Sequence, residues 1–214
     1  FATMDPALRS KGINAFVLDP TMQGFSVGKK ELKLGIRGSD TVQLVFDEMR
    51  VPAENLLGEE GQGFKIAMHT LDGGRIGIAT QAVGIAQACL DVAVEFAEGH
   101  EMFGRRLADN QLVSHKIADM ATRIEASRLL TYRAALLKDA GKPHSRQASM
   151  AKLSSSEIAN DAARMALEIH GGAGIGRQSP IERLFRDAKI CEIYEGTSQI
   201  QRLVISRHVR PDRG

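Results

Sequence analysis

One acidic side chain lies in a setting that suits a catalytic base. Glu195 falls within CEIYEGTSQIQRLVIS, residues 191–206, where a glycine follows it and apolar residues such as Ile193, Ile200 and Leu203 flank it. Apolar surroundings desolvate a carboxylate, which raises the pKa of the carboxyl group and makes it a stronger base. The structural alternative is an acid near the N-terminus of the next helix, where the helix dipole stabilises the anion. The residues alone leave both interpretations open.

A second set of charges lies in LDGGRIGIA, residues 71–79, where Asp72 and Arg75 interrupt a small and apolar helical segment. Charged side chains in such a segment are costly to bury. Their i, i+3 spacing suits an ion pair along one helix face. The functional alternative is an arginine that receives an anionic or carbonyl-bearing ligand.

Two further segments are rich in glycine or arginine. HGGAGIGR, residues 170–177, matches neither common phosphate-loop pattern, so a helix stop followed by a turn is the favoured interpretation. Its glycines still allow a ligand to approach the backbone closely. HEMFGRRL, residues 100–107, places Arg105 and Arg106 together, which indicates a solvated linker or, as the alternative, a phosphate contact.

Two kinds of secondary structure must position these residues. Short β-rich runs, separated by glycine and proline, predict part of an antiparallel β domain from residues 13–19, 25–30 and 41–51. Apolar residues at helical spacing and glycine stops predict helices over residues 63–99, 108–140, 145–170, about 180–193 and 198–208. Short loops between long helices predict an antiparallel bundle. We therefore expect a mainly α chain, α+β overall, with the C-terminal part of a β domain at 1–57 and a C-terminal helical bundle domain at 58–214.

Two local features complete this outline. Ser198 and Gln201 have the spacing of a capping box, which predicts that Ser198 caps the last helix. The sequence begins at Phe1 within a β-rich run and without an initiator methionine, which predicts a fragment of a longer chain.

Composition argues against several classes of function. The formal net charge is +2 and aromatic residues make up 5% of the chain, which does not predict a nucleic-acid partner. The two cysteines and six histidines lack the spacing of metal ligands, so we expect no metal site. No apolar run approaches the roughly 18 residues of a membrane span, and no signal peptide is visible. We therefore expect a protein that has no membrane span and is not secreted.

Several segments, in one order along nearly the whole chain, resemble the acyl-CoA dehydrogenase family, and within it the short-chain, butyryl-CoA type. The match is most specific in IYEGTSQIQRLVI; the matching segments are KLGIRGSDTVQLVFDEMRVPAENLLGEEGQGFKIAM, LDGGRIGIATQAVGIAQACLD, KIADMATRIEASRLLTYRAALLKD, MAKL and RDAKICEIYEGTSQIQRLVI. Chains of this family have a helical N-terminal domain, a β domain and a C-terminal bundle. The resemblance implies that this chain holds the end of the β domain and the bundle, and that such a fragment is inactive alone.

The resemblance implies an oxidoreductase of fatty-acid β-oxidation, in which Glu195 removes the α-proton of an acyl-CoA thioester while a hydride passes from the β-carbon to FAD. Some family members carry the base instead at the position that Gly74 matches here, and glycine cannot act as a base. Other matched positions imply substrate-binding roles for Asp72, Arg75 and Gly196. Positions matched to FAD contacts are His100, Phe103, Gln111, Glu168, Gly171, Gly172, Thr197 and Gln199.

Two of these positions differ from the usual residues of the family. His100 replaces an arginine that reaches the FAD diphosphate of a neighbouring subunit, and Glu168 replaces a glutamine. Because neutral histidine supplies one donor and no charge, we expect weaker FAD binding unless Arg105 or Arg106 compensates. This leaves two alternatives to the dehydrogenase: a non-catalytic homologue that serves as an assembly or partner subunit, and an enoyl-CoA reductase on the same scaffold.

The family resemblance also implies partners and a compartment. It predicts a homotetramer that passes electrons to an electron-transferring flavoprotein. The compartment would be the bacterial cytoplasm or the mitochondrial matrix.

Overall fold

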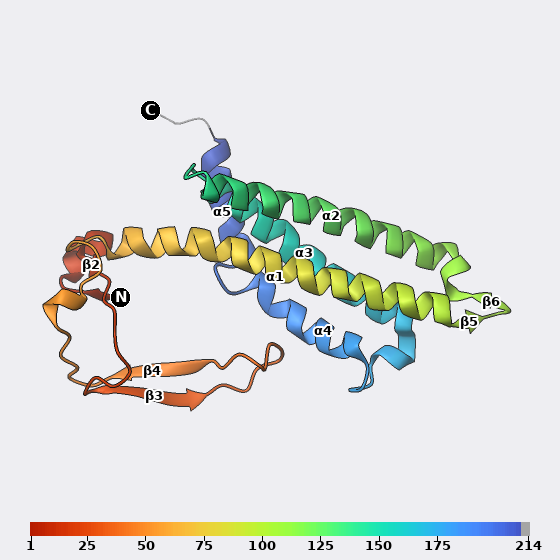
Figure 1. Cartoon of the computed structure of the whole chain (residues 1–214), viewed down its shortest axis with the longest axis horizontal. Helices are drawn as coiled ribbons and strands as arrows, with labels where there is room; N and C mark the ends of the chain where they lie inside the picture. The colour runs from red at the N-terminus through yellow and green to blue at the C-terminus, as the bar shows by residue number, and fades with distance from the viewer. Residues whose placement is uncertain (211–214) are drawn as a thin grey trace. The chain divides into compact units, whose positions relative to one another are not determined.

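The structure is a computed structural model that describes residues 1–210, and it divides into two compact units. The first unit comprises Phe1–Lys33 and Arg37–Leu71, and the second comprises Leu34–Ile36 and the chain from Asp72 onward. The boundary falls within the first long helix, α1 (Gly63–Gly99), which begins in the first unit and continues through the second (Figure 1).

Short strands and turns make up the first unit before α1. Its described elements are β1 (Ala2–Thr3), η1 (Pro6–Gly12), β2 (Ile13–Asn14), β3 (Phe25–Lys30), β4 (Val42–Phe46) and η2 (Ala53–Asn55). β1 pairs with β2 and β3 pairs with β4, both antiparallel, and Phe25 lies opposite Phe46 with ring centroids 5.8 Å apart. Each predicted β-rich run therefore contains a strand. The run at 13–19 forms a shorter strand than predicted because β1 offers β2 only two paired residues.

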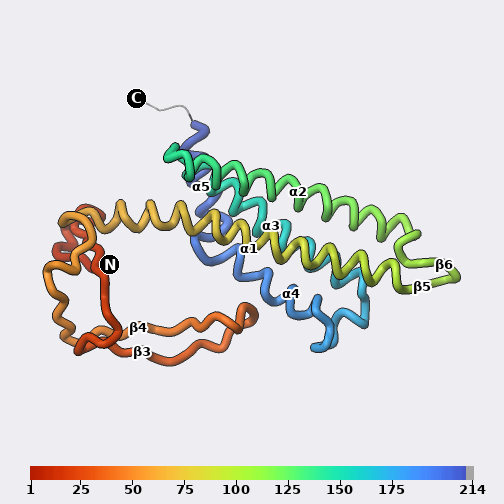
Figure 2. Tube along the Cα trace, in the orientation of Figure 1, coloured from red at the N-terminus to blue at the C-terminus, as the bar shows by residue number. Residues whose placement is uncertain are grey.

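The second unit is a helical bundle (Figures 1 and 2). Besides α1, its long helices are α2 (Gln111–Asp139) and α3 (Ser145–His170), which begin and end close to the predicted boundaries. The side chain of Asn110 caps α2 by accepting a hydrogen bond from Leu112 N at 3.0 Å. α3 ends at Gly171, where φ is +54°, as the predicted glycine stop requires.

Shorter elements connect and extend these helices. A hairpin of β5 (Glu101–Met102) and β6 (Arg105–Arg106), followed by η3 (Leu107–Asp109), joins α1 to α2. After α3 come η4 (Gly171–Gly174), α4 (Pro180–Ala188), η5 (Lys189–Glu192) and α5 (Ser198–Val209). α4 and α5 both pack on α3.

Residues 34–36 belong to this helical unit because they hydrogen-bond to α4. Ile36 N donates to the Asp187 carboxylate at 2.6 Å, and Arg186 Nη1 donates to Leu34 O at 3.1 Å. A Cβ at Gly35 would overlap the backbone of Arg186, so only glycine allows this close approach.

Small side chains fill much of the bundle core. The alanines that α1 and α3 bury completely include Ala82, Ala86, Ala93, Ala97, Ala159, Ala162, Ala163 and Ala166. Larger residues, among them Met120, Ile124 and Ile158, complete the same core cluster. Alanine at helix contacts lets the helix axes approach closely, because less side-chain volume separates them.

By length and composition, α1 could cross a membrane. This finding is weak evidence, because the core helix of a soluble protein passes the same test, and α1 contributes residues such as Ala86 and Cys89 to the bundle core. The prediction that no segment is long and apolar enough for a span is nevertheless wrong. The small apolar residues that suit close helix packing also make α1 apolar as a whole.

The junction before the last helix differs from its predicted form. The cap of α5 is Thr197, not Ser198, and its hydroxyl accepts a hydrogen bond from Ile200 N at 3.4 Å. The predicted capping box is therefore wrong, because the helix begins one residue earlier than that pattern assumes. The predicted helix at 180–193 divides into α4 and the tighter turn η5.

Removing core volume is expected to destabilise the bundle. Ile158 on α3 is 1% exposed. Ile158→Ala should lower the free energy of unfolding by about 2–4 kcal/mol, because the variant loses the transfer free energy of the removed methyl and methylene groups and leaves a cavity. Urea denaturation followed by circular dichroism measures this change. The control is Leu136→Ala on α2, where the side chain is 69% exposed and a change within about 0.5 kcal/mol is expected. Equal effects at both positions would contradict the core assignment.

Candidate active site

Glu195 lies in the turn between η5 and α5, where the backbone is left-handed. The φ angle is +55° at Glu195 and +93° at Gly196. Glycine adopts such angles freely, whereas a residue with a Cβ pays about 1–2 kcal/mol. The Glu195 side chain is partly buried, and its Oε2 atom is buried without a hydrogen-bond partner among the described residues. An unpartnered buried carboxylate oxygen costs folding energy and often marks a functional group.

The carboxylate of Glu195 lies against α1 at Gly74. A Cβ at position 74 would stand 2.7 Å from Glu195 Cδ and 2.9 Å from Oε1, closer than real Cβ contacts allow. The missing side chain of Gly74 therefore provides the space that the carboxylate occupies. The sequence alone marked Gly74 only as a position that cannot carry a base.

Two buried side chains that the sequence did not single out hold the backbone of this turn. Lys152 on α3 is 0% exposed and donates from Nζ to Gly196 O at 2.7 Å. Gln201 on α5 donates from Nε2 to Glu195 O at 3.1 Å and to Gly196 O at 2.9 Å. Two helices thus fix the two carbonyl groups that flank the Cα of Gly196. A lysine within a helical segment carries no sequence signal for burial, so this role was missed.

Asp72 and Arg75 form the predicted ion pair, with Arg75 Nη1 2.6 Å from Asp72 Oδ1. Ser145 Oγ on α3 donates to the same carboxylate oxygen at 2.9 Å, and Ser149 Oγ lies 3.4 Å from Arg75 Nη1. Arg75 is 5% exposed, and its Nε atom is buried without a hydrogen-bond partner in the described part of the chain. The pair is therefore structural, yet it leaves one guanidinium donor for a ligand.

The thiol and the phenol of the Glu195 segment are poor bases near neutral pH. Desolvation is the main cause that raises the pKa of the Cys191 thiol to about 11 and also raises the pKa of Tyr194 above its ordinary value. The Tyr194 hydroxyl donates to Gln81 Oε1 on α1 at 2.6 Å. Both groups therefore stay protonated, and Glu195 is the acid with a free, buried oxygen.

Four predicted cofactor residues meet in a second location, where α1 and α3 end near β5 in Figure 2. His100, Glu168, Gly171 and Gly172 line a pocket of about 410 Å³, together with side chains from α1, η3 and the start of α2. The His100 ring stacks on Phe96 with centroids 3.6 Å apart. The structure thus brings together residues that lie about 70 positions apart in the sequence.

Glu168, one of the two acids that line this pocket, the other being Glu101, is neutralised by two cations. Glu168 forms ion pairs with Lys116 at 2.6 Å and with Arg164 at 2.7 Å. The hydrogen bond from Lys116 is the main cause that lowers the pKa of the Glu168 carboxyl group. Two cations thus offset the charge of Glu168, and one of them, Lys116, also lines the pocket, which reduces the repulsion expected between this acid and an anionic ligand.

Arg105 and Arg106, in the β5–β6 hairpin, differ in whether they form ion pairs. Arg106 forms ion pairs with Glu98 at 2.7 Å and with Asp109 at 3.1 Å. Arg105 is exposed and forms no ion pair with the residues that the structure describes. Arg105 is therefore the arginine available to compensate for the missing family arginine.

The remaining predicted cofactor residues lie outside this pocket. Phe103 is 96% exposed in the β5–β6 hairpin, and Gln111 is exposed at the start of α2. Thr197 caps α5, and Gln199 is exposed in its first turn. The predicted residues thus fall into a group around Glu195, a group around His100, and exposed positions near each.

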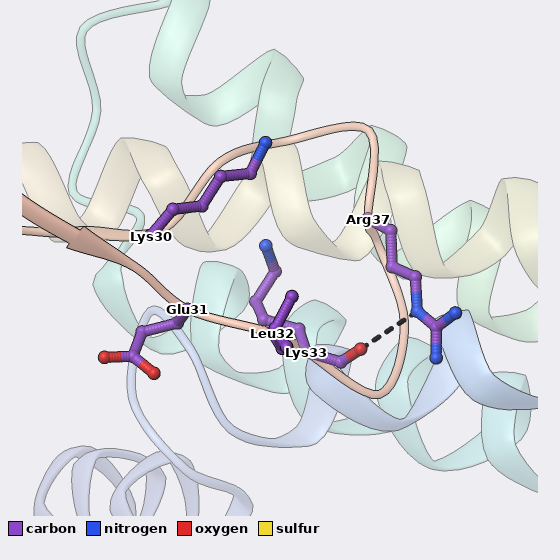
Figure 3. A pocket seen from close by; sticks show the side chains of 5 residues that line it. All are labelled: Lys30, Glu31, Leu32, Lys33 and Arg37. Carbon is purple, nitrogen blue, oxygen red and sulfur yellow. Dashed lines mark hydrogen bonds between the residues drawn. The ribbon is translucent and has the colours of Figure 1, made fainter.

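A hollow in the first unit contains none of the predicted site residues. Lys30, Glu31, Leu32, Lys33 and Arg37 line it, and Arg37 Nε donates to Lys33 O at 3.0 Å (Figure 3). Its lining side chains lie mostly at the surface, so it offers no enclosed site. Within residues 1–210, no group of three or more histidine, cysteine or acidic side chains could hold a metal ion.

Comparison with known proteins identifies the family. The profile of the acyl-CoA dehydrogenase C-terminal domain matches residues 61–210, which is most of the chain and includes the whole helical bundle. The chain therefore belongs to the acyl-CoA dehydrogenase family.

Individual relatives agree with this assignment. The chain is 54% identical to human mitochondrial short-chain specific acyl-CoA dehydrogenase over 98% of this chain and 51% of that protein. It is 49% identical to the NADH-dependent acryloyl-CoA reductase of Anaerotignum propionicum, covering 98% and 53%. The structure of butyryl-CoA dehydrogenase from Megasphaera elsdenii superimposes with a TM-score of 0.96 at 48% identity, covering 97% and 54%. The mainly α fold is thus confirmed, and the chain spans about half the length of these relatives.

A methyl group at position 74 should disturb Glu195. Replacing an exposed helical glycine by alanine usually stabilises a protein by about 0.5–1 kcal/mol. We expect this gain for Gly77→Ala, because a Cβ at position 77 would meet nothing within 4 Å. Gly74→Ala should lose this gain because its Cβ displaces the Glu195 carboxylate. Urea denaturation of both variants provides the test. Equal stabilisation by the two substitutions would show that Glu195 is not held against Gly74.

Proposed function

We propose that the whole protein is an FAD-dependent acyl-CoA dehydrogenase that oxidises a short-chain acyl-CoA thioester, with Glu195 as the base. One observation carries the proposal: the Glu195 carboxylate lies partly buried beside Gly74, with one oxygen that no described residue satisfies. Such an oxygen is free to approach a substrate carbon, and partial burial limits the water that would compete for it.

The chemistry requires a base at the α-carbon and a hydride acceptor at the β-carbon. Glu195 takes the α-proton, and the electron pair of that C–H bond is first shared with the thioester carbonyl as enolate character. As the hydride leaves the β-carbon, this pair becomes the α,β double bond. When bound, FAD supplies the acceptor for the hydride that leaves the β-carbon. The protonated Glu195 then returns its proton to solvent, which restores the carboxylate for the next turnover.

Residues on α1 would hold the substrate. Arg75 is fixed by Asp72 and Ser149, and its unpartnered Nε can donate to an acyl-CoA oxygen. Gly196 follows the base directly, so its backbone would lie beside a thioester whose α-carbon is at Glu195. We propose Asp72, Arg75 and Gly196 as substrate-binding residues on these grounds.

The pocket around His100 suits a phosphate-bearing part of FAD. Added Cβ atoms at Gly171 and Gly172 would meet nothing within 4 Å, so their backbone is open to a ligand. Lys116 lines the pocket and, together with Arg164, neutralises Glu168. We propose His100, Glu168, Gly171 and Gly172 as residues of this contact, with Phe103, Gln111, Thr197 and Gln199 as further FAD-contacting positions.

The partners and the compartment are part of the same proposal. We propose a homotetramer that passes electrons to an electron-transferring flavoprotein. The human relative is named as a mitochondrial enzyme and a further relative, 52% identical, belongs to Bacillus subtilis, which supports the mitochondrial matrix or the bacterial cytoplasm as the compartment.

One alternative is kept and one is set aside. The acryloyl-CoA reductase relative supports reduction of an enoyl-CoA as a second candidate function, because the same acid could return a proton to the α-carbon. Comparing butyryl-CoA oxidation with NADH-dependent enoyl-CoA reduction separates the two directions. A non-catalytic role is set aside, because Glu168, one of the two residues that suggested it, is neutralised by Lys116 and Arg164.

Removing the base is expected to abolish flavin reduction. In the whole protein, Glu195→Gln should bind butyryl-CoA normally but reduce the flavin about 10²–10⁴-fold more slowly, because an amide cannot accept the α-proton. Stopped-flow absorbance of the flavin measures the rate. Glu192→Gln is the matched control, because it alters an acid of the same segment that pairs with Lys189. Rapid flavin reduction by Glu195→Gln would refute the assignment of the base.

Restoring the family arginine should strengthen cofactor binding. His100→Arg adds a charge-assisted donor to the pocket, so we expect the Kd for FAD to fall about tenfold. Equilibrium dialysis of the deflavinated whole protein measures this constant. His208→Arg is the control: His208 is exposed, and its Nδ1 lies 2.9 Å from Val204 O, four residues earlier, as His100 Nδ1 lies 2.9 Å from Phe96 O. An unchanged Kd in His100→Arg would rule out a role for position 100 in FAD binding.

A further inference from the structure

Lys152 is the largest side chain that the bundle buries completely. It lies in the N-terminal half of α3, and the one hydrogen bond that the described residues give its ammonium group runs to Gly196 O at 2.7 Å. Desolvation is the main cause that lowers the pKa of Lys152 below its ordinary value. Burying this cation therefore costs folding energy. Its hydrogen bond goes to a carbonyl of the turn that carries Glu195.

Stability alone does not explain a buried ammonium group. Replacing a buried charge by an apolar side chain of similar volume is often neutral or stabilising, because the desolvation penalty disappears. A methionine would fill the space of Lys152 without that penalty. The lysine differs from methionine in its charge and in the hydrogen bond to Gly196 O.

The hydrogen-bonded turn has a conformation that needs support. Glu195 adopts a φ angle of +55°, which is unfavourable for a residue with a Cβ. Gln201, which is 0% exposed, donates to the carbonyls of both Glu195 and Gly196 at 3.1 and 2.9 Å. Gly196 O thus receives two donors, one from α3 and one from α5, which fix the peptide that follows the base.

We propose that Lys152 and Gln201 are positioning residues that hold the left-handed Glu195–Gly196 turn, and thereby aim the carboxylate of Glu195 beside Gly74. Neither side chain touches the substrate; each acts through a backbone carbonyl. The inference rests on the proposed function, in which Glu195 is the base.

The test compares variants that remove each donor without changing side-chain volume greatly. Lys152→Met and Gln201→Met are made in the whole protein, singly and together, and Lys189→Met serves as the control because Lys189 is exposed on η5 and pairs with Glu192. Three quantities are measured: the melting temperature, the Kd of a butyryl-CoA thioether that cannot be oxidised, and the rate constant of flavin reduction by butyryl-CoA.

The expected pattern separates positioning from folding. Lys152→Met should keep the melting temperature and the thioether Kd, but reduce the flavin about 10²-fold more slowly, since a small misplacement of a catalytic group costs that much. Gln201→Met should slow reduction as well, and the double variant should be no slower than the worse single variant, because both donors serve one turn. Lys189→Met should match the wild type.

A rescue experiment adds a readout that a purely structural role would not move. Propylamine added to Lys152→Ala should restore part of the flavin reduction rate, because it returns an ammonium group to the cavity. Propanol, which has a similar volume but no charge, should not restore it. Equal rescue by propanol would overturn the proposal, because volume rather than charge would then be the cause.

Other outcomes also decide the matter. A folded Lys152→Met that reduces flavin at the wild-type rate overturns the proposal. If Lys152→Met does not fold, Gln201→Met decides: a normal rate in that variant overturns the proposal, and a slow rate with an unchanged thioether Kd supports it. Glu195→Gln measured in parallel separates the two hypotheses, because rapid flavin reduction there refutes the proposed function, whereas a dead Glu195→Gln beside a normal Lys152→Met refutes only the positioning role.

Discussion

The carboxylate of Glu195 occupies space beside α1 that a side chain at position 74 would otherwise fill. The conformation of the turn that carries Glu195 and the packing of the helices around it depend on this contact. Glycine at position 74 leaves the carboxylate in place, because a Cβ there would overlap it and force the side chain of Glu195 to shift. The turn that delivers Glu195 to this point must be left-handed at two successive residues. The helices around the turn must therefore approach closely enough to hold it, which the fully buried alanines of α1 and α3 allow.

Stability and catalysis make opposite demands on this region. Lys152, Arg75 and the free oxygen of Glu195 are all buried, and each costs folding energy in proportion to its desolvation. An apolar core of the same volume would fold at least as well. The fold therefore offsets these costs elsewhere, in the alanine and isoleucine core. The buried polar groups lie where α1, α3 and α5 meet at the turn that carries Glu195. This is the distribution expected of a site that needs fixed geometry.

The sequence predicts the helices well because each has an apolar period and a marked end, such as Gly171 after α3. Glu195 became the candidate base through the family resemblance, since its apolar neighbours alone left two interpretations open, and Ile193, Ile200 and Leu203 are exposed in the structure. Lys152 could not, since only tertiary packing buries it, and a helical lysine is usually exposed. The cap at Thr197 was missed because threonine and serine are adjacent and both suit an N-cap, while only Ser198 has the glutamine of a capping box three residues on. The pairing of Glu168 with Lys116 joins two helices, so no local pattern could reveal it.

The replacement of an arginine by His100 has a more specific consequence than the loss of a charge. His100 Nδ1 lies 2.9 Å from Phe96 O, and a carbonyl oxygen can only accept, so Nδ1 carries the proton. In the neutral ring, Nε2 is then an acceptor, so that nitrogen offers a phosphate no donor. An arginine has donors only, so the two side chains differ in hydrogen-bond direction as well as in charge. A cation of the pocket can supply attraction for an anion, and Glu168 holds Lys116, which lines the pocket, in an ion pair of 2.6 Å.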